Sequence, residues 1–184
     1  MSRRGLRKPN EVTTCGDTVV VHLTKGQSAL VDLCDYPLVS GHRWVATAAD
    51  GVWYAKATVR SPDDRRVSLF MHRAILGLGS GDTLAVDHID GNGLNNSRAN
   101  LRLATTSQNA MNRRKRASAH SRHKGISLHP SGLWKASICC RGKIVRLGYF
   151  RDEQEAALAY NRAAMELFGE FACLNEVGVV PSTD

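Results

Sequence analysis

The N-terminal part of the chain is patterned as a series of short strands. Runs of β-branched and aromatic residues alternate with breaks of Gly, Pro and Asp, which is typical of strands joined by turns. The runs lie at residues 19–23, 28–33, 43–46, 52–57 and 66–70. One short helix is predicted over residues 71–78, because the glycines that follow it are helix breakers.

The pattern then changes to a strand, a polar loop, a second strand and a helix. Residues 84–88 are apolar up to an Asp-His pair, and Asp90-Gly91-Asn92-Gly93 is a strong turn signal. Residues 100–104 can return as the second strand. Thr105 is placed to cap the helix, which puts Asn109 in its first turns.

The C-terminal part has a pattern of its own. Three antiparallel strands are predicted at residues 124–128, 134–140 and 143–150. A helix then runs from its capping residue Asp152 to about Phe168, with Gly169 just past its end. The apolar stripe of this helix can only be buried against one face of the sheet.

Alternation along the middle strand assigns the two faces of this sheet. The residues predicted to point toward the helix are Trp134, Ala136, Ile138 and Cys140. With a turn at 141–142, Arg146 lies on the opposite, outward face, across from Ser137. A face that carries Lys135, Arg141 and Arg146 has the size and charge to enter a DNA major groove.

The overall charge is compatible with a polyanionic partner. Lys and Arg number 25 against 17 Asp and Glu, which gives a net charge of +8 and a pI near 9.6. Counterion release and electrostatic steering then favour nucleic acid, although many basic proteins are merely soluble. Residues 113–123 form a basic stretch with Arg113, Arg114, Lys115 and Arg116, followed by Lys124. The stretch is either a solvated linker or an arm that tracks phosphates.

Cysteine use and hydropathy exclude several classes of protein. The five cysteines are scattered and contain no C-x-x-C pair, so no disulfide framework and no structural zinc are expected. No apolar run is long enough to span a bilayer, and the basic N-terminus lacks the apolar segment of a signal peptide. We therefore expect an intracellular, cytoplasmic and nucleoid-associated protein with no membrane partner.

The Asp-His pair carries the chemistry. Phosphodiester hydrolysis needs a deprotonated water, a neutralised phosphate and a stabilised leaving alkoxide. His88 is suited to the first task, and Asp87 with Asn109 supplies the hard oxygen ligands that one Mg²⁺ or Mn²⁺ prefers. The amide of Asn100, on the returning strand, can hold His88 in position. Adjacent strand residues point to opposite faces, so Asp87 and His88 need a strand end or bulge to converge.

Each of these residues also has an ordinary structural interpretation. The Asp-His pair alone could be a capped strand end with a surface histidine, but Asn100 and Asn109 at fixed spacing disfavour that view. The loop residues Asn92, Asn95 and Asn96 are expected to hold the turn through side-chain-to-backbone bonds. His72 is left open between a phosphate-facing role and simple packing.

Residues 84–112 resemble the HNH nuclease motif of the ββα-metal fold, in the branch found in homing endonucleases. The matching positions are Asp87-His88, Asp90-Gly91-Asn92, Asn95-Asn96, Asn100-Leu101-Arg102 and Thr105 through Asn109. Carried over by position, the resemblance implies that His88 is the general base and that Asp87 and Asn109 are metal ligands. It implies that Asn100 orients the base. The stretch from Leu23 to Arg73 resembles the β-rich lead-in of the same group.

Residues 124–177 resemble the plant ethylene-response-factor (Apetala-type) DNA-binding domain, which is also found fused to such nucleases. The matching pieces are Lys124-Gly125-Ile126, Gly132-Leu133-Trp134, Leu147-Gly148-Tyr149-Phe150, Glu155 through Ala164 and Leu174-Asn175. The sequence departs from the plant pattern at base-contacting positions, which here hold Ser127, His129, Ser137 and Cys139, with Arg146 in place of a tryptophan. The resemblance therefore implies the fold of the plant domain but not the DNA sequence that the domain recognises.

These observations predict an α+β protein in which a β-rich region leads into a ββα-metal core, followed by a separate three-stranded antiparallel sheet packed on one helix. The expected divisions are a flexible basic arm at 1–16, the lead-in and nuclease domain at 17–112, the basic linker at 113–123, the Apetala-type domain at 124–177 and a tail at 178–184.

The favoured function is a DNA endonuclease that uses one Mg²⁺ or Mn²⁺ and acts on double-stranded DNA as a monomer or homodimer. The alternative from another class is a non-catalytic, sequence-specific DNA-binding regulator built on the same scaffold. Retention of all four site residues, Asp87, His88, Asn100 and Asn109, favours the enzyme. A nuclease that acts on structured RNA or in defence stays open.

Overall fold

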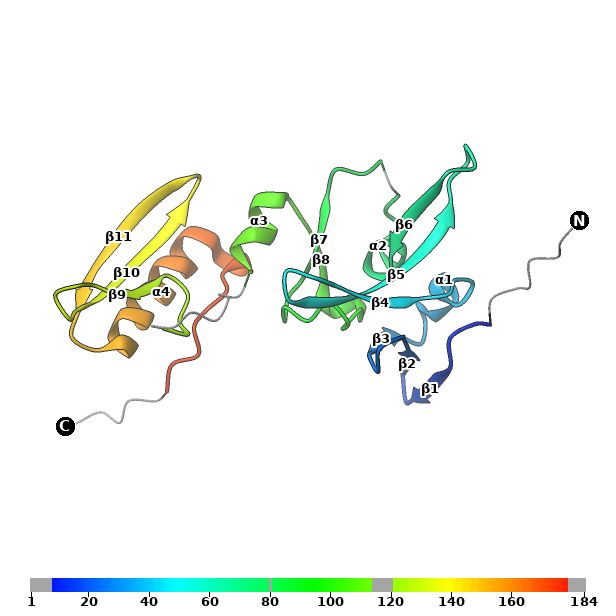
Figure 1. The fold of residues 1–184 in the computed structure, drawn as a ribbon, viewed down its shortest axis with the longest axis horizontal. Coiled ribbons are helices and arrows are strands. Elements are labelled where there is room, and N and C mark those ends of the chain that lie inside the picture. Colours follow the sequence, from blue (N-terminus) through cyan, green and yellow to red (C-terminus); the bar gives the residue numbers. More distant parts are fainter. Residues whose placement is uncertain (1–7, 80, 114–120, 179–184) are drawn as a thin grey trace, which may run out of the picture. The chain divides into compact units, whose positions relative to one another are not determined.

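The structure, a computed structural model, describes residues 8–79, 81–113 and 121–178 (Figure 1). The chain divides into two compact units, Met1–Thr106 and Ser107–Asp184. Among the described residues, the first unit holds two three-stranded antiparallel sheets and a two-stranded ladder, and the second holds one three-stranded sheet with a long helix. The α+β class predicted from the sequence is confirmed.

The first sheet is a meander of β1 (Val12–Cys15), β2 (Thr18–His22) and β3 (Ser28–Asp32). Alternate residues of β2 and β3 are buried, as a strand with one face on the core requires. Strand β1 pairs with β2 along its whole length. Residues 12–15 are therefore part of a sheet, which differs from the flexible arm expected over residues 1–16.

The second sheet is a meander of β4 (Val45–Ala49), β5 (Val52–Arg60) and β6 (Arg66–Phe70). It is flanked by α1 (Tyr36–Ser40), which the sequence pattern did not predict, and by α2 (Met71–Ile75), which it did. Alternation gives β5 two different faces. One face is buried through Ala55 and Ala57, and the other carries polar and aromatic side chains.

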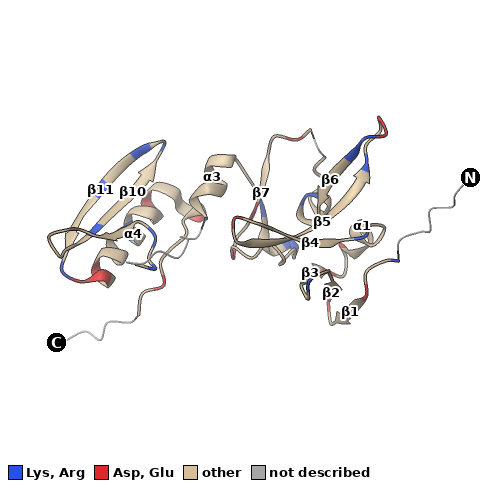
Figure 2. Ribbon diagram, viewed as in Figure 1, with Lys and Arg blue, Asp and Glu red and all other residues tan. Residues whose placement is uncertain are grey.

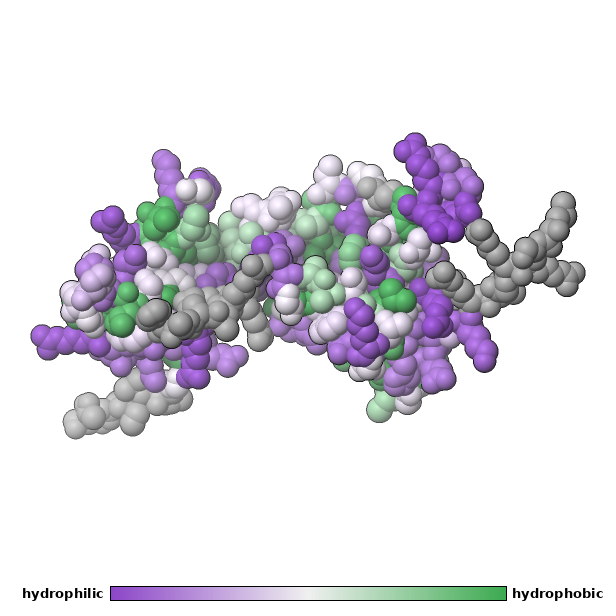
Figure 3. Space-filling view, viewed as in Figure 1, coloured by the Kyte–Doolittle hydropathy of each residue, from purple (hydrophilic) through white to green (hydrophobic). Residues whose placement is uncertain are grey.

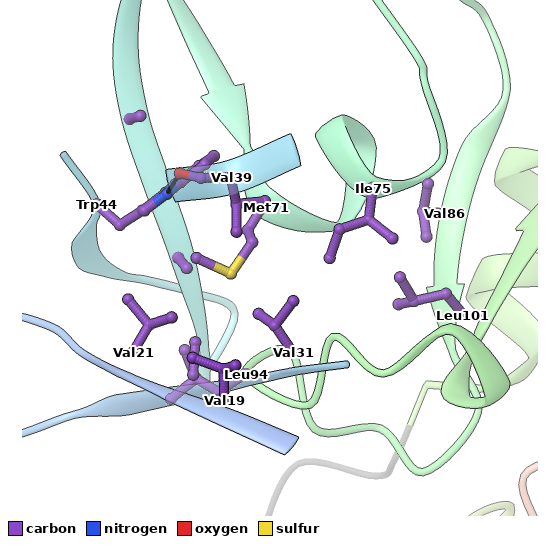
Figure 4. Packing of buried hydrophobic residues seen from close by; sticks show 13 residues of the cluster. Val19, Val21, Val31, Val39, Trp44, Met71, Ile75, Val86, Leu94 and Leu101 are labelled. Atoms are coloured by element: carbon purple, nitrogen blue, oxygen red, sulfur yellow. Dashed lines mark hydrogen bonds between the residues drawn. The ribbon is translucent and has the colours of Figure 1, made fainter. Parts of the chain in front are cut away.

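The core of the first unit lies between these two sheets and the elements that follow them. Figure 4 shows β-branched residues of β2 and β3 facing Trp44 and Met71, with Ile75, Val86, Leu94 and Leu101 completing the cluster. Trp44 is 1% exposed, and its indole Nε1–H donates to the Val39 carbonyl at 2.8 Å. The polar atom of the largest core side chain is thereby satisfied, as burial demands.

A polar loop joins β7 (Ala85–His88) to the 3-10 turn Arg98–Asn100 and to β8 (Leu101–Ala104). The loop is fastened to β3, because the Leu30 amide donates to the Leu94 carbonyl at 2.9 Å and the Asn96 amide donates to the Leu30 carbonyl at 2.8 Å. At its far end Arg98 binds Asp35 through two nitrogens, at 3.0 and 2.6 Å.

The second unit contains α3 (Thr106–Met111), the sheet of β9 (Ile126–Leu128), β10 (Trp134–Cys140) and β11 (Lys143–Phe150), and α4 (Glu153–Phe168). A 3-10 turn, Gly169–Phe171, follows. The predicted helix ends are confirmed. The Asp152 side chain accepts from the amides of Gln154 and Glu155 at 2.8 and 3.0 Å, and Gly169 ends α4 with φ +54°.

The predicted assignment of sheet faces is also confirmed. Ala136 and Ile138 are buried in one cluster with residues of α4, namely Ala156, Ala157, Tyr160 and Ala164. On the other face Ser137 is paired with Arg146, as the predicted turn required. The ladder shifts register between Ala136 and Ser137, a bulge that the pattern did not reveal.

The C-terminal segment of this unit is tied to its beginning. The Asn175 side chain accepts from the Lys124 amide and donates to the Lys124 carbonyl, and its backbone is held by the Asn161 amide group. His123 contacts Glu153 at 2.7 Å through Nδ1 and the Glu176 carbonyl at 3.3 Å through Nε2. Within the described part of the chain, no helix is long and apolar enough to cross a membrane.

Gly125 provides a test of this packing. It has φ +77°, and a Cβ there would lie 2.2 Å from Tyr160 Cδ2 and 2.5 Å from the Ser137 carbonyl oxygen. We expect Gly125→Ala to destabilise the second unit by about 3–5 kcal/mol, through left-handed backbone strain plus overpacking. Gly132→Ala is the matched control, because Gly132 has φ +82° with nothing within 4 Å of its Cβ. It should cost only about 1–2 kcal/mol. Equal losses in urea unfolding would contradict the packing.

Candidate nuclease centre

Asp87 and His88 are the last two residues of β7 and are 3% and 6% exposed. The β7–β8 ladder is regular, so the two side chains leave β7 on opposite sides, but β7 ends at His88 and the charge of Asp87 still acts on the His88 ring. Arg102, directly opposite Asp87 on β8, donates from Nε and Nη2 to Asp87 Oδ2 at 2.8 and 2.6 Å. The buried carboxylate is therefore compensated by a half-buried guanidinium, as a charge in this position requires.

The His88 ring lies in an aromatic cluster. Its centroid is 5.0 Å from that of His72, nearly perpendicular at 89°, and 5.9 Å from that of Tyr54. Phe70 stacks on His72 at 5.5 Å and meets Tyr54 edge-on at 6.1 Å. The four rings come from β5, the end of β6, α2 and β7, so the sheet, the helix and the ladder together fix the plane of the imidazole.

Asn96 contacts the His88 ring through a polar atom. It is fully buried, and its Nδ2 donates to the Leu94 carbonyl at 3.0 Å, which turns Oδ1 toward His88 Nε2 at 3.5 Å. Because an amide oxygen only accepts, His88 carries its proton on Nε2 when neutral. Nδ1 is then the nitrogen that accepts a proton.

Burial sets the charge state of His88. The cost of burying an imidazolium lowers the pKa of His88 below its ordinary value of 6.5, and this outweighs the raising effects of the Asn96 bond, Asp90 and Asp87. The ring is consequently neutral at neutral pH. A neutral imidazole with a fixed tautomer is the form that a general base needs.

Asn100 holds the loop rather than the imidazole. Its Oδ1 accepts from the Asp90 amide at 3.0 Å, and its Nδ2 donates to Asp90 Oδ1 at 2.9 Å and to the Asn95 carbonyl at 2.8 Å. The expected direct contact of the Asn100 amide with His88 is thus replaced by bonds that shape the loop, while Asn96 makes the contact with His88. The sequence predicts only a turn-holding role for Asn96.

The loop carboxylate Asp90 is stabilised in its charged form. Burial alone would raise the pKa of Asp90, but hydrogen bonds from Asn95, the Asn92 amide and Asn100 outweigh burial and lower it. The Asn95 Nδ2 donates to Asp90 Oδ2 at 2.8 Å, and Asn92 Oδ1 accepts from the Leu94 amide at 3.1 Å. The predicted structural role of the loop asparagines is therefore confirmed. Asn96 in addition contacts the His88 ring.

His72 is the residue whose role the sequence left open. It belongs to α2, is 9% exposed, and its Nδ1 is the one buried side-chain nitrogen or oxygen in the described part of the chain that has no hydrogen-bond partner. Burial, with smaller effects from His88 and Arg73, lowers the pKa of His72 to about 3. The site therefore contains two neutral imidazoles side by side.

The donor set suits a hard ion that keeps its own waters. Asp87 provides a carboxylate, and no cluster of three or more His, Cys, Asp or Glu side chains able to hold a metal occurs among the described residues. Mg²⁺ is commonly held by one or two carboxylates together with substrate phosphates and water, so such a set fits it. Asn109, the second expected ligand, lies half-buried in α3 and belongs to the second unit.

The predicted DNA-contacting residues fall into three groups. Lys135, Ser137 and Arg146 lie on the outward face of the second unit's sheet, where Tyr149 pairs with Lys135 and contacts the His129 ring at 5.0 Å. Arg113 is exposed, and Arg141 is exposed in the β10–β11 turn with φ +51°. Three further predicted residues, Arg114, Lys115 and Arg116, lie outside the described residues.

Lys124 was expected on the DNA-binding surface, and its structural position is different. Its Nζ donates to the Met111 carbonyl, and burial lowers its pKa. The backbone of Lys124 is also bonded to Asn175. Lys124 is therefore a link between α3, β9 and the C-terminal segment of the second unit.

Comparisons with known proteins show the family to which the chain belongs. Residues 41–111 match the family model described as HNH endonuclease. The uncharacterized HNH endonuclease L560 of Acanthamoeba polyphaga mimivirus is 34% identical over 154 residues, which cover 83% of this chain and 77% of the viral protein. Protein 3.8 of Escherichia phage T7 is 36% identical over 88 residues, 47% of this chain and 72% of the phage protein. The chain belongs to the HNH endonuclease family.

A second similarity concerns plant proteins. Ethylene-responsive transcription factor ERF069 of Arabidopsis thaliana is 31% identical over 97 residues, which cover 50% of this chain and 59% of the plant protein. The chain thus contains an AP2/ERF-like region, and the sheet β9–β11 packed on α4 has the corresponding architecture. Both predicted family resemblances are confirmed.

The low pKa of His72 makes stability depend on pH. In the unfolded chain His72 takes up a proton near its ordinary pKa of 6.5, whereas in the folded chain it stays neutral down to about 3. Stability is therefore lost as the pH falls below 6.5. His72→Phe removes this contribution, and we expect the wild type to lose about 1–2 kcal/mol more than the variant between pH 7 and pH 5 in urea unfolding. An equal fall in the free energy of unfolding for the two proteins between pH 7 and pH 5 would contradict the burial of a neutral His72.

Proposed function

We propose that the protein is a DNA endonuclease that hydrolyses phosphodiester bonds with His88 as general base and one divalent metal ion, and that its second unit directs it to DNA. The observation that carries the proposal is the setting of His88. The ring is neutral, its Nε2 faces Asn96, and its plane is fixed by the rings of Tyr54 and His72. A general base requires this combination of charge, tautomer and orientation.

The base step follows from the tautomer. Nδ1 of His88 takes a proton from the attacking water, and Nε2–H keeps its bond to Asn96 Oδ1. The imidazolium so formed is stabilised by the negative charges of Asp90 and Asp87, which raise the pKa of His88. The buried ring thus starts neutral, and the two carboxylates offset part of the cost of burying the charge that it gains.

Asp87 of the first unit would hold the metal ion, and Asn109 stays the second ligand predicted from the sequence. When bound, one Mg²⁺ or Mn²⁺ supplies positive charge to the phosphate and to the leaving oxygen. Arg102 is paired with Asp87 Oδ2 and orients the carboxylate.

The outer face of β4–β5–β6 supports DNA as the substrate. Alternation places Tyr54, Lys56, Thr58 and Arg60 on one face of β5, with Arg60 directly opposite Arg66 on β6. Tyr54 touches His88, so this polar face extends from the proposed reaction centre along the hairpin. The hairpin tip is strongly hydrophilic (Figure 3). At the tip Arg60 is paired with Asp64 and Arg65 with Asp63, and a two-stranded ribbon of this kind has the dimensions of a DNA major groove.

The second unit offers a separate surface for DNA. Its outward sheet face carries Lys135, Ser137 and Arg146, and basic residues line β11 (Figure 2). Tyr149 and Ile144 add exposed apolar area to the same face, at 48% and 74% exposure. Arginine can read guanine edges, and apolar groups can contact thymine methyl groups, so the face is chemically able to select a sequence.

The first test of this function is cleavage of supercoiled plasmid in Mg²⁺ or Mn²⁺. We expect nicked or linear product that disappears with chelator. His88→Ala should abolish cleavage while leaving the affinity for DNA in chelator near that of the wild type, because the base acts only in the chemical step. His42→Ala is the matched control, since His42 also packs edge-on against an aromatic ring, that of Trp44.

The outcomes separate the two classes of function. Cleavage that survives His88→Ala would remove the general-base assignment. Absence of cleavage by the wild type in either metal, together with retained DNA binding, would instead favour the non-catalytic regulator.

The targeting role is tested on Arg146. Arg146→Ala should weaken binding to a selected DNA site by about 1–3 kcal/mol if the guanidinium contacts bases. Arg162→Ala removes the same charge from the exposed side of α4, which packs on the opposite face of the sheet, and should have a much smaller effect. Equal losses of DNA affinity for the two variants in a binding titration would contradict the targeting role of Arg146, because they would show that only the total charge of the unit affects binding.

A further inference from the structure

His72 has chemical features that packing does not explain. Its ring stacks on Phe70 at an interplanar angle of 16° and meets Tyr54 and His88 edge-on. A phenyl ring would make the same contacts and would leave no polar atom unsatisfied. Instead the histidine has a buried Nδ1 without a partner, in a part of the chain where every other described buried side-chain nitrogen or oxygen is paired.

The position of the unpaired nitrogen assigns the tautomer. The ring is neutral, so one nitrogen carries a hydrogen and the other a lone pair. A hydrogen on Nδ1 would be a buried donor with no acceptor. Nε2 is not among the atoms that are both buried and unpaired in the described residues, so it is the ring nitrogen open to the outside. The hydrogen therefore belongs on Nε2, where a partner from outside the chain can accept it.

Nε2–H also lies in the right place. The ring centroids of His72 and His88 are 5.0 Å apart, so a group that reaches the base also reaches His72. The His72 side chain makes no hydrogen bond to a described residue, so its donor is available to a substrate. Lys56, two residues beyond Tyr54, lies on the same polar face of β5, and Tyr54 contacts the His72 ring. This polar face therefore adjoins the His72 side chain.

We propose that His72 is a second catalytic imidazole, which donates its Nε2–H to a non-bridging oxygen of the phosphodiester that His88-activated water attacks. The two histidines have divided roles. His88 gains a proton in the reaction, whereas His72 keeps its proton and offers a fixed hydrogen bond to the charge that develops on the phosphate. Its very low basicity prevents it from competing with His88 for the proton of the water. The proposal rests on the proposed nuclease function.

The variants His72→Phe and His72→Gln separate the hydrogen bond from packing. His72→Phe keeps the ring and removes the donor, so single-turnover cleavage should slow on the order of 10²-fold, the usual effect of losing one such donor. Its thermal stability at pH 7 should equal or exceed that of the wild type, because the unpaired Nδ1 is gone. His72→Gln restores a donor and should recover part of the rate. His42→Phe, beside Trp44, controls for replacing a histidine within an aromatic contact.

The result that would overturn the proposal is cleavage by His72→Phe within threefold of the wild type. A rate loss that is matched by a loss of folded protein would also overturn it, since it would show a packing role alone.

A second measurement does not depend on cleavage. Nitrogen-15 NMR of the imidazoles in chelator should show His72 as the Nε2–H tautomer, and a saturating random-sequence DNA duplex should shift this resonance. An Nδ1–H tautomer, or no shift at saturation, would overturn the proposal even if the wild type cuts no DNA. Failure of the wild type to cut would, by contrast, count against the nuclease function itself.

Discussion

The hydrogen-bonded loop between β7 and β8 is the constraint on which the rest of the first unit depends. Asn100, Asp90 and Asn95 bond to one another inside the loop, and the backbone of residues 94–96 pairs with Leu30 of the first sheet. The closed loop thereby joins the ladder to the core and presents Asn96 to His88. Neutral amides are suited to this task because one side chain both donates and accepts, so they satisfy buried backbone without adding charge.

The loop explains how so short a ladder can hold the side chains of the site in fixed positions. A two-stranded ladder has little stability alone, but the loop holds one end, and the rings of Tyr54 and His72 pack against His88 at that end. Burial then keeps both imidazoles neutral, and an asparagine with a fixed amide orientation sets the tautomer of one of them. Rigid, satisfied surroundings are what a preorganised reaction centre requires.

The sequence predicted those features that depend on local physics. Strand periodicity located β2, β3, β5 and β6, the Asp152 cap and Gly169 located both ends of α4, and alternation gave the faces of β10. The long-range contacts could not be predicted from local sequence patterns. Strand β1 forms because it has β2 as a partner, and α1 is a single short turn held by its neighbours. Likewise Asn96, rather than Asn100, reaches His88, because the loop path decides which amide faces inward.

The role of Asn96 tests the central claim most directly, namely that the loop makes His88 a working base. Single-turnover cleavage of DNA at saturating Mg²⁺ should be compared for Asn96→Ala and Asn92→Ala, since Asn92 bonds only within the loop. We predict that Asn96→Ala slows cleavage on the order of 10²-fold relative to Asn92→Ala, because the tautomer of the base is no longer fixed. Equal rates for the two variants, with both proteins folded, would contradict the account.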